Sequence, residues 1–581
     1  MSSAFIATSV DSLGSVEKGD VVYTDYWDVI QAARSAGIEC RDLREVFADE
    51  PERVDAAVME WADWVTSLAE PTWRGAPLTP AIRVDLTWRV FFPLARHAIA
   101  ACTLAESGSP ITIDLPSGTL IGDAVLAGAR DAGGKVSQLA SGKSLPLPAS
   151  HAPVTPEIGA SLQRYRALRL ISPLISLRSR IAGRGLDGRP RIAISYYTSL
   201  VPILHRLAER AWFALWPWAL PPPAQAGMML SDGGSCLDPS TPADAVDLEE
   251  ARSTFVEILG GADFDASGIE VSEIFRRHTS AVAGELLRYS LYRTAAAHSS
   301  LGSTRPDAVL VPFDVGLSAA PLVAAANELG IPTILVQHGA EGSLIPGDKR
   351  LASDVLVWSG QIADHYRSMP EYGDPSKFRA TGAAMLEPLT GLRPTAGREG
   401  ERDGVLFLSH PTLHNTACDS WMASENYLAA IAEVVRNLPE GMRVSGLKIH
   451  PSESHEHYRQ VAEAVGLHVP LITDGRIPDV LDGVQLVAGP ESTGLLEAWQ
   501  AGRAPVCANL GGIPMAPPFD GSTEIPVVPS VTVLTDLLRR WHEGKWSFAD
   551  PAPNLECEIG NVAGSIDETV EAILEIAGRG R

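Results

Sequence analysis

The sequence predicts an α/β protein with two domains, each built on a parallel sheet. Short apolar runs alternate with longer segments of helical period, which is the pattern of β-α-β units. Several of these runs end in a turn of glycine, proline or a polar residue, as strands of a parallel sheet do before the next helix. The chain has 581 residues, more than one ordinary domain holds.

Composition narrows the class of protein. Apolar residues make up 45% of the chain, ample for real cores, and the net charge is −24. A chain this acidic lacks the basic field of a general nucleic-acid-binding protein, so no nucleic-acid partner is expected. Six scattered cysteines form no Cys-x-x-Cys pair, which predicts reduced thiols in a cytoplasmic protein without a zinc site. No signal peptide and no apolar run of spanning length is expected.

The first half of the chain begins with strands and helices in alternation. Strands are expected at 21–23, 38–43, 111–115, 135–139, 191–196 and 226–230, and helices at 27–36, 51–68, 81–104, 120–132 and 270–297. The segment 111–139 is typical of a β-α-β unit, and its turn, Ser117-Gly118-Thr119, either caps the helix or holds an anion.

The second half continues the same alternation. Strands are expected at 308–312, 332–336, 354–358, 405–408, 444–449, 484–488, 504–508 and 525–528, and helices at 317–329, 531–542 and 566–577. The segment from Leu386 to Gly404 is rich in proline, glycine and charge, and is interpreted as the interdomain linker. The predicted division is an N-terminal Rossmann-like domain with helical insertions (1–390), a C-terminal Rossmann-like domain (391–565) and a C-terminal helix (566–581).

Two segments of the N-terminal half suggest a surface for membranes. Arginines recur between apolar residues from Gln163 to Arg191, which indicates either a solvated helix face or a surface for anionic lipid headgroups. Trp212 to Trp218 contains three tryptophans, which form either an interfacial anchor or part of the core. Together they predict a protein that associates peripherally with an anionic inner membrane.

The stretch from Leu447 to Val506 carries the strongest functional signal. His450-Pro451 ends one apolar run, Gly489-Pro490 ends another, and Ser492-Thr493 begins a helical pattern. The free amides and positive dipole of such a helix start make an anion site. If the two strands are parallel neighbours, both motifs lie at one carboxyl edge, where open α/β sheets bind ligands. The alternative is that Ser492 only caps a helix and His450 only ends a strand.

Polar side chains also follow two strands of the first domain. Asp314 follows the strand at 308–312, and His338 follows the strand at 332–336, so the two lie on neighbouring loops if these strands pair in parallel. Either side chain could take a proton from an acceptor hydroxyl, although His338 could also be a structural strand-end histidine. Asp263-Phe264-Asp265 has the form of a metal-binding Asp-x-Asp motif, but no long apolar strand precedes it. It is interpreted as a chance match, so no metal or cofactor is expected.

The two motifs together resemble those of a known family. Leu447-Lys-Ile-His-Pro451, followed by Gly489-Pro-Glu-Ser-Thr-Gly-Leu-Leu-Glu-Ala498, is similar to the His-Pro and Ser-Ser/Thr motifs of bacterial surface-polysaccharide glycosyltransferases with the GT-B fold. That group includes sialyltransferases, capsule Kdo transferases and, more distantly, the glycerophosphotransferases of teichoic acid assembly. Thr333 to Gly339 also resembles a Gln-His-Gly segment of surface-carbohydrate enzymes. The resemblance extends over about Asp307 to Leu510.

The resemblance implies two Rossmann-like domains facing a cleft and a nucleotide-sugar donor, by preference a CMP-sugar. It implies that His450, Ser492 and Thr493 hold the donor phosphate, and the adjoining Pro451 and Gly494 are assigned to the same donor site. Related enzymes use a carboxylate of an acidic-acidic-Gly motif as catalytic base. Here Asp314-Val315-Gly316 matches that motif in part, and the carboxylates that compete with it are Asp123 and Asp232-Gly233-Gly234.

The predicted function is a metal-independent glycosyltransferase. It would move a sugar, such as a nonulosonic acid or Kdo, onto a capsule or other surface glycan, a glycolipid or a glycoprotein. Asp314, His338 and His450 are the catalytic candidates, and Glu497 contacts the donor ribose or is a solvated helix residue. One alternative is a hydrolysing nucleotide-sugar 2-epimerase, whose helix resembles Glu497-Ala498 followed by the segment Gly502 to Val506. Another is a non-catalytic scaffold of a polysaccharide assembly complex.

Overall fold

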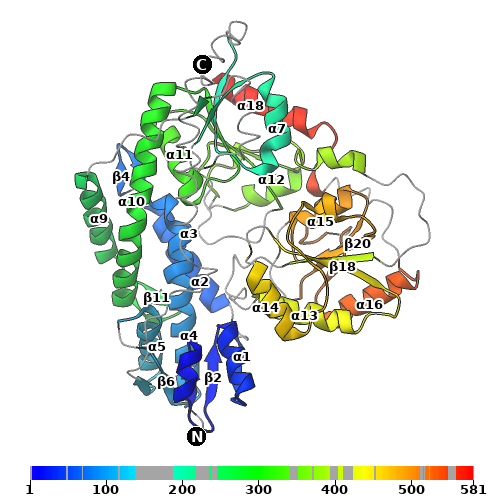
Figure 1. Cartoon of the computed structure of the whole chain (residues 1–581). Coiled ribbons are helices and arrows are strands. Elements are labelled where there is room, and N and C mark those ends of the chain that lie inside the picture. Colours follow the sequence, from blue (N-terminus) through cyan, green and yellow to red (C-terminus); the bar gives the residue numbers. More distant parts are fainter. Residues whose placement is uncertain are drawn as a thin grey trace.

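The computed structural model describes residues 3–579 with gaps. The longer gaps are 139–187, 220–234, 237–244, 341–350, 393–403, 410–422 and 547–557, and the shorter ones are 48–49, 51, 69, 116–117, 217–218, 370–371, 451–452, 454, 511–514, 516 and 523. Three parallel sheets with surrounding helices organise the described chain (Figure 1). The α/β class predicted from the sequence is confirmed.

The first sheet is built from residues near the N-terminus. Its spatial order is β3-β2-β1-β6-β7, all parallel, with bounds Ala4–Ile6 (β1), Val21–Thr24 (β2), Cys40–Asp42 (β3), Ile111–Ile113 (β6) and Val136–Gln138 (β7). Helices α1 (Trp27–Ser35) and α5 (Leu120–Asp131) connect its strands. The predicted β-α-β unit is β6-α5-β7, and Thr119 caps α5 by accepting a hydrogen bond from the Gly122 amide.

A helical layer joins the first sheet to the second (Figure 1). It contains α2 (Glu52–Ser67), α3 (Arg83–Leu86), α4 (Phe92–Glu106), α9 (Ala245–Gly260) and the 33-residue α10 (Ser272–Thr304). Trp61, Phe91 and Phe275 pack ring against ring inside it. Burying one phenylalanine stabilises a fold by about 1.5–3 kcal/mol, so these contacts hold the layer together. Residues 1–390 therefore contain two sheets, where the sequence predicted one Rossmann-like domain with helical insertions.

The second sheet has seven strands in the order β10-β9-β8-β13-β14-β15-β16, all parallel. Their bounds are Arg191–Ile194 (β8), Trp212–Leu215 (β9), Ser235–Cys236 (β10), Ala308–Val311 (β13), Thr333–Val336 (β14), Asp354–Val357 (β15) and Phe378–Ala380 (β16). Helices α7 (Val201–Ala208), α11 (Gly316–Glu328) and α12 (Gly360–Arg367) cover it.

The C-terminal helix α18 (Ser565–Arg579) packs on this second sheet (Figure 1). Its Val570, Ile573 and Ile576 are buried in one cluster with Ile194 and Leu310 of the sheet. The amphipathic pattern predicted a helix here, but its partner lies far back in the chain. The end of the polypeptide therefore completes the core of the seven-stranded sheet.

The described part of the tryptophan cluster packs into the fold, as the core alternative predicted, and Trp218 lies outside the described residues. Trp212–Leu215 forms β9, and Trp216 is fully buried with its indole Nε1 donating to the Ser318 carbonyl at 2.8 Å. Most of the arginine-rich stretch, and the strand expected at 226–230, lie outside the described residues. Within the part of the chain that the structure describes, no helix is both long and apolar enough to cross a membrane.

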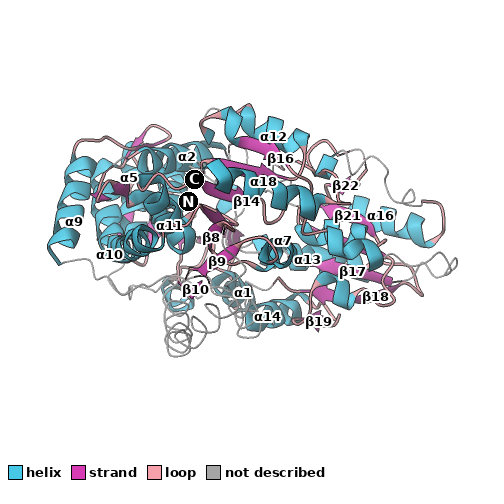
Figure 2. Ribbon diagram, turned by 90° about the horizontal axis from the view of Figure 1, so that it is seen from above, coloured by secondary structure: helices cyan, strands magenta, loops and turns pink. Residues whose placement is uncertain are grey.

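The third sheet has six parallel strands in the order β19-β18-β17-β20-β21-β22. Their bounds are Gly404–Leu408 (β17), Arg443–Lys448 (β18), Leu471–Ile472 (β19), Leu486–Gly489 (β20), Ala504–Ala508 (β21) and Val527–Val528 (β22). Its helices are α13 (Ala423–Arg436), α14 (His455–Val465), α15 (Thr493–Gln500) and α16 (Val531–His542). Figure 2 shows the strands of the second and third sheets as separate groups.

The second and third sheets share a continuous hydrophobic core. Leu335 and Val357 of the second sheet belong to the same buried cluster as Leu406 and Val487 of the third. The first part of the predicted linker, Glu387–Leu392, is a 3-10 helix in which Thr390 Oγ1 accepts a hydrogen bond from Gln500 Nε2 at 2.8 Å. The two sheets are thereby fixed relative to one another along one side.

Candidate functional site

The start of α15 lies at the carboxyl edge of the third sheet, directly after β20. Ser492 has the extended backbone of an N-cap, with φ −159° and ψ 141°, and its Oγ accepts a hydrogen bond from the Gly494 amide at 3.1 Å. Gly489 lets the chain pass close to β17, because a Cβ there would lie 2.6 Å from Leu408 Cβ. The turn places the first amides of α15 and its positive dipole end at the sheet edge, as an anion site requires.

His450 lies on the same sheet edge, but one strand further from α15 than the sequence suggested. The order places β17 between β18 and β20, so the strands that carry the two motifs are parallel members of one sheet but are not direct neighbours. Ser409, the first residue after β17, fills the intermediate position. Its Oγ accepts a hydrogen bond from the His450 amide at 2.8 Å. All three strands are parallel, so Ser409, His450 and Ser492 lie on one edge.

The surroundings of His450 favour a neutral ring. Partial enclosure by protein and, after it, the positive charge of Lys448 lower the pKa of His450 below its ordinary value. Lys448 is buried, and its Nζ donates to the Ile449 carbonyl at 3.1 Å. His450 itself keeps an exposed surface that a ligand can reach. The lowered pKa favours the uncharged ring at neutral pH, and in that form one ring nitrogen can donate a hydrogen bond and the other can accept one.

His338 lies at the carboxyl edge of the second sheet, after β14. β13 and β14 pair in parallel, so Asp314 and His338 lie on neighbouring loops as predicted. His338 Nδ1 lies 3.0 Å from the Pro312 carbonyl oxygen. A carbonyl can only accept, so Nδ1 carries the proton and Nε2 carries the lone pair of the neutral ring. This tautomer suits a general base.

Asp314, the other predicted base of this domain, is buried in the fold. Its side chain has no exposed surface, and its Oδ2 accepts a hydrogen bond from the Ala352 amide at 2.8 Å. The carboxylate thus ties the loop after β13 to the residues that lead into β15. A side chain in this position has no open path to an acceptor hydroxyl. The geometry favours a structural role for Asp314 and a catalytic role for His338.

The competing carboxylate Asp123 belongs to the first sheet. Its Oδ1 accepts a hydrogen bond from the Gly118 amide at 2.9 Å, and its Oδ2 pairs with Arg277 and with His278 Nε2, the latter at 3.1 Å. These contacts tie α5 to α10 and account for the position of the Asp123 carboxylate. Asp232 and Pro451 lie outside the described residues.

A contact between the two sheets brings the predicted motifs together. The Ala340 amide, two residues after His338, donates a hydrogen bond to Thr493 Oγ1 at 2.7 Å. Gly339 packs so closely that a Cβ on it would lie 2.8 Å from the same oxygen. The loop that carries His338 therefore touches the first residue of α15. Two motifs 153 residues apart form one composite site.

Substituting Gly339 by alanine should separate the two halves of this site. The added Cβ requires the loop or Thr493 to shift by several tenths of an ångström, which weakens the Ala340–Thr493 hydrogen bond. We expect catalytic turnover to fall about tenfold while the melting temperature changes little. The matched control is Gly302→Ala in α10, where a Cβ meets nothing within 4 Å. Equal turnover in both variants would show that the contact has no role in catalysis.

Glu497 lies on the second turn of α15, behind the anion-binding end. Burial raises its pKa to about 7, an effect that Arg476 opposes and Asp479 reinforces. A carboxyl group of this kind exchanges its proton near neutral pH and can hydrogen-bond a hydroxyl in either form. The position of Glu497 is compatible with a contact to the donor ribose, and that contact stays a prediction.

The raised pKa predicts how stability depends on pH. Between about pH 4.5 and 7 the folded protein holds a proton on Glu497 that the unfolded chain has lost, so this group lowers stability as pH rises through that window. Glu497→Gln should therefore raise the melting temperature at pH 8 and leave it nearly unchanged at pH 4.5. The control is the exposed Glu433→Gln on α13. A parallel shift at both pH values would contradict the assignment.

Sequence reasoning missed three residues of the composite site. Ser409 follows β17, Tyr197 follows β8 and Phe313 follows β13. Each is the polar or aromatic residue that comes just after an apolar strand, which is the signal that located His338 and His450. Many residues of the chain follow an apolar strand in this way. The strand order is therefore needed to show which of them lie on the same sheet edge.

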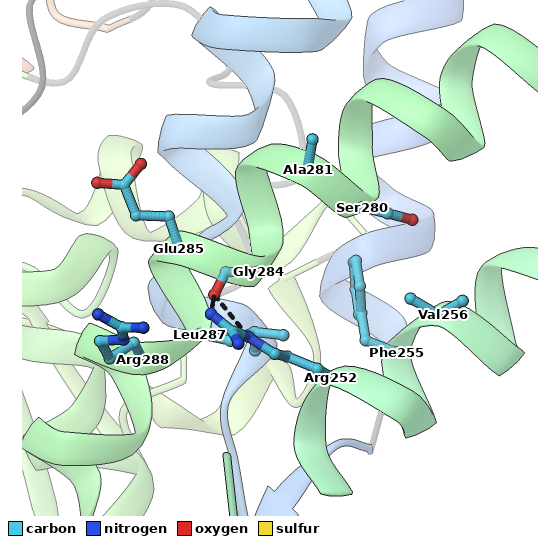
Figure 3. A pocket seen from close by; sticks show the side chains of 9 residues that line it. All are labelled: Arg252, Phe255, Val256, Ser280, Ala281, Gly284, Glu285, Leu287 and Arg288. Carbon is cyan, nitrogen blue, oxygen red and sulfur yellow. Dashed lines mark hydrogen bonds between the residues drawn. The ribbon is translucent and has the colours of Figure 1, made fainter. Parts of the chain in front are cut away.

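A separate hollow of about 590 Å³ lies between α9 and α10, in the helical layer (Figure 3). Phe255 and Leu287 line its apolar part, and Arg252 also lines it. The Arg252 guanidinium donates twice to the Gly284 carbonyl, at 3.0 and 2.7 Å, and so joins the two helices. This hollow shares no lining residue with the composite site.

The second and third sheets, with their helices, are two parallel α/β units in contact at their carboxyl edges, which is the arrangement of the GT-B fold. No protein-family model and no curated protein matches the chain. Among solved structures, it is similar to a putative UDP-N-acetylglucosamine 2-epimerase from Listeria monocytogenes (14% identity, 66% of this chain and 96% of that chain covered, TM-score 0.40). It is also similar to the wall teichoic acid polymerase TagF, with 8% identity, 73% of this chain and 97% of that chain covered, and a TM-score of 0.37. For MurG from Acinetobacter baumannii the identity is 10%, the coverage is 67% of this chain and 99% of that chain, and the TM-score is 0.36. Sequence identities and TM-scores this low support no inference about the activity or substrate of this chain.

Proposed function

We propose that the protein is a metal-independent glycosyltransferase that uses a nucleotide-sugar donor. The observation that carries this proposal is the contact between Ala340 and Thr493. It brings a histidine with the tautomer of a base to the start of a helix suited to bind phosphate. Such a pairing supplies both groups that sugar transfer needs, one for the acceptor proton and one for the leaving phosphate.

In the proposed reaction the acceptor hydroxyl oxygen attacks the anomeric carbon of the donor sugar. The bond from that carbon to the phosphate oxygen breaks, and its electron pair leaves with the nucleotide. The attack is a single displacement on the face opposite the phosphate, so transfer inverts the anomeric centre, and His338 Nε2 takes the proton of the hydroxyl. The amides of α15, the Ser492 and Thr493 hydroxyls and the neutral His450 ring stabilise the charge that grows on the leaving phosphate.

The nucleotide is proposed to be cytidine, because the His-Pro and Ser-Thr motifs resemble those of CMP-sugar users. A thermal-shift screen of CMP, CDP, UDP and GDP, each with its sugars, tests this choice. We expect CMP to raise the melting temperature most, since ligands that bind the folded state stabilise it. A larger shift with UDP would overturn the choice of base. Release of nucleotide that needs no acceptor would instead favour the epimerase reaction.

Activity should persist when metal is removed. Asp263 is exposed and pairs with Arg276 at 3.0 Å, and Asp265 accepts a hydrogen bond from the Gly268 amide at 2.7 Å in the turn between β11 (Asp265–Ala266) and β12 (Ile269–Glu270). These contacts give the two carboxylates structural roles, which supports reading the Asp-x-Asp pattern as a chance match. We expect full turnover in EDTA. Activity that is lost in EDTA and restored by Mn²⁺ or Mg²⁺ would contradict this prediction.

A further inference from the structure

Three aromatic rings lie together at the carboxyl ends of three adjacent strands, and one of them, His338, is on the loop that contacts Thr493. Tyr197 follows β8, Phe313 follows β13, and His338 follows β14, and these strands are consecutive and parallel in the second sheet. The Tyr197 and His338 ring centroids are 5.3 Å apart, and Phe313 lies 5.8 Å from the first and 5.7 Å from the second. All three pairs meet edge to face, the favourable geometry for aromatic rings.

Tyr197 is the exposed member of this aromatic triad. It is 39% exposed, whereas its neighbour Tyr196 is buried and held by a hydrogen bond from its amide to the Ala219 carbonyl at 3.1 Å. Few other large apolar side chains of the described residues are this open to solvent, and they lie elsewhere: Val10, Val256, Tyr292, Leu392 and Val533. Covering the exposed surface of an aromatic ring by a bound ligand is favourable, because it removes apolar surface from water.

We propose that Tyr197 is a specificity residue that stacks against a pyranose ring of the acceptor. This inference rests on the function proposed above and names the class of acceptor, a ring sugar of a glycan. The C–H groups on one face of a pyranose are slightly positive and suit the negative face of an aromatic ring. Because the His338 ring lies beside the Tyr197 ring, with centroids 5.3 Å apart, a sugar on the tyrosine would present its hydroxyl groups next to the base. A chain of glycerol phosphate has no such face.

The direct test uses saturation-transfer NMR on the whole protein and needs no turnover. The probes are methyl β-D-glucopyranoside, methyl β-D-galactopyranoside and glycerol 3-phosphate. We expect transfer from aromatic protons to ring C–H protons of at least one glycoside, retained in Tyr197→Phe and reduced at least fivefold in Tyr197→Ala. Tyr292→Ala, which removes a similarly exposed tyrosine from α10, is the matched control and should behave as the unchanged protein. Undiminished transfer in Tyr197→Ala, or a signal for glycerol 3-phosphate alone, overturns the proposal.

Steady-state kinetics provide a second readout once an acceptor is in hand. Tyr197→Ala should raise the acceptor KM about tenfold and leave the donor KM unchanged, whereas Tyr197→Phe should change neither. A merely structural tyrosine would lower the melting temperature and raise both constants, which would overturn the proposal. Stacking that is lost in Tyr197→Ala, in a protein that transfers no sugar from any nucleotide, would instead defeat the proposed function and leave a carbohydrate-binding protein.

Discussion

Alanine at His450, or at Ser492 and Thr493 together, is expected to reduce sugar transfer by roughly 30- to 1,000-fold. Each change removes a group that stabilises charge on the leaving phosphate, and comparable deletions from oxyanion holes cost about 2–4 kcal/mol. The loss should fall on kcat, because the charge is largest in the transition state. Single-turnover and multiple-turnover experiments on each variant measure this loss of kcat directly.

The control for this prediction is Ser530→Ala. Ser530 caps α16 in the same sheet unit and accepts a hydrogen bond from the Val533 amide, much as Ser492 caps α15. Losing either cap costs about 1 kcal/mol of stability, so both variants should melt at slightly lower temperature. Only the change at Ser492 should affect transfer. Full activity in His450→Ala would remove that residue from the site.

His338→Ala is expected to lower turnover by about 100- to 10,000-fold, the range that a general base contributes. Its Nε2 is the proposed proton acceptor. Added imidazole should restore part of the activity of the alanine variant, because a free base can occupy the vacated space. His338→Gln, which can still hydrogen-bond the Pro312 carbonyl, should remain inactive and should not respond to imidazole.

The variant Asp314→Asn distinguishes a catalytic role of Asp314 from a structural one at the carboxyl edge of the second sheet. The asparagine keeps the size of the side chain but weakens the hydrogen bond from the Ala352 amide, since the acceptor loses its charge. We expect a lower melting temperature and nearly normal turnover per folded molecule. Loss of turnover on the scale of His338→Ala, with stability intact, would return Asp314 to the role of catalytic base.

The local elements of this protein follow from short stretches of its sequence. The apolar runs that become β13, β14, β17 and β20 were predicted within one or two residues, and so was the N-cap at Ser492. These features depend on residues only a few positions apart, because a strand needs its own apolar side chains and a cap needs its own first turn. The site candidates at strand ends follow from the same local rule.

The way these elements meet is visible in the folded protein alone. The fold placed β17 between the two motif strands, turned Trp212–Leu215 into a buried strand, and split the N-terminal half into two sheets. Strand order and sheet contacts depend on residues far apart in the chain, and such pairings leave no periodic pattern in the sequence. The hydrogen bond from Ala340 to Thr493 is the clearest case, since 153 positions separate the residues that join the base candidate to the phosphate helix.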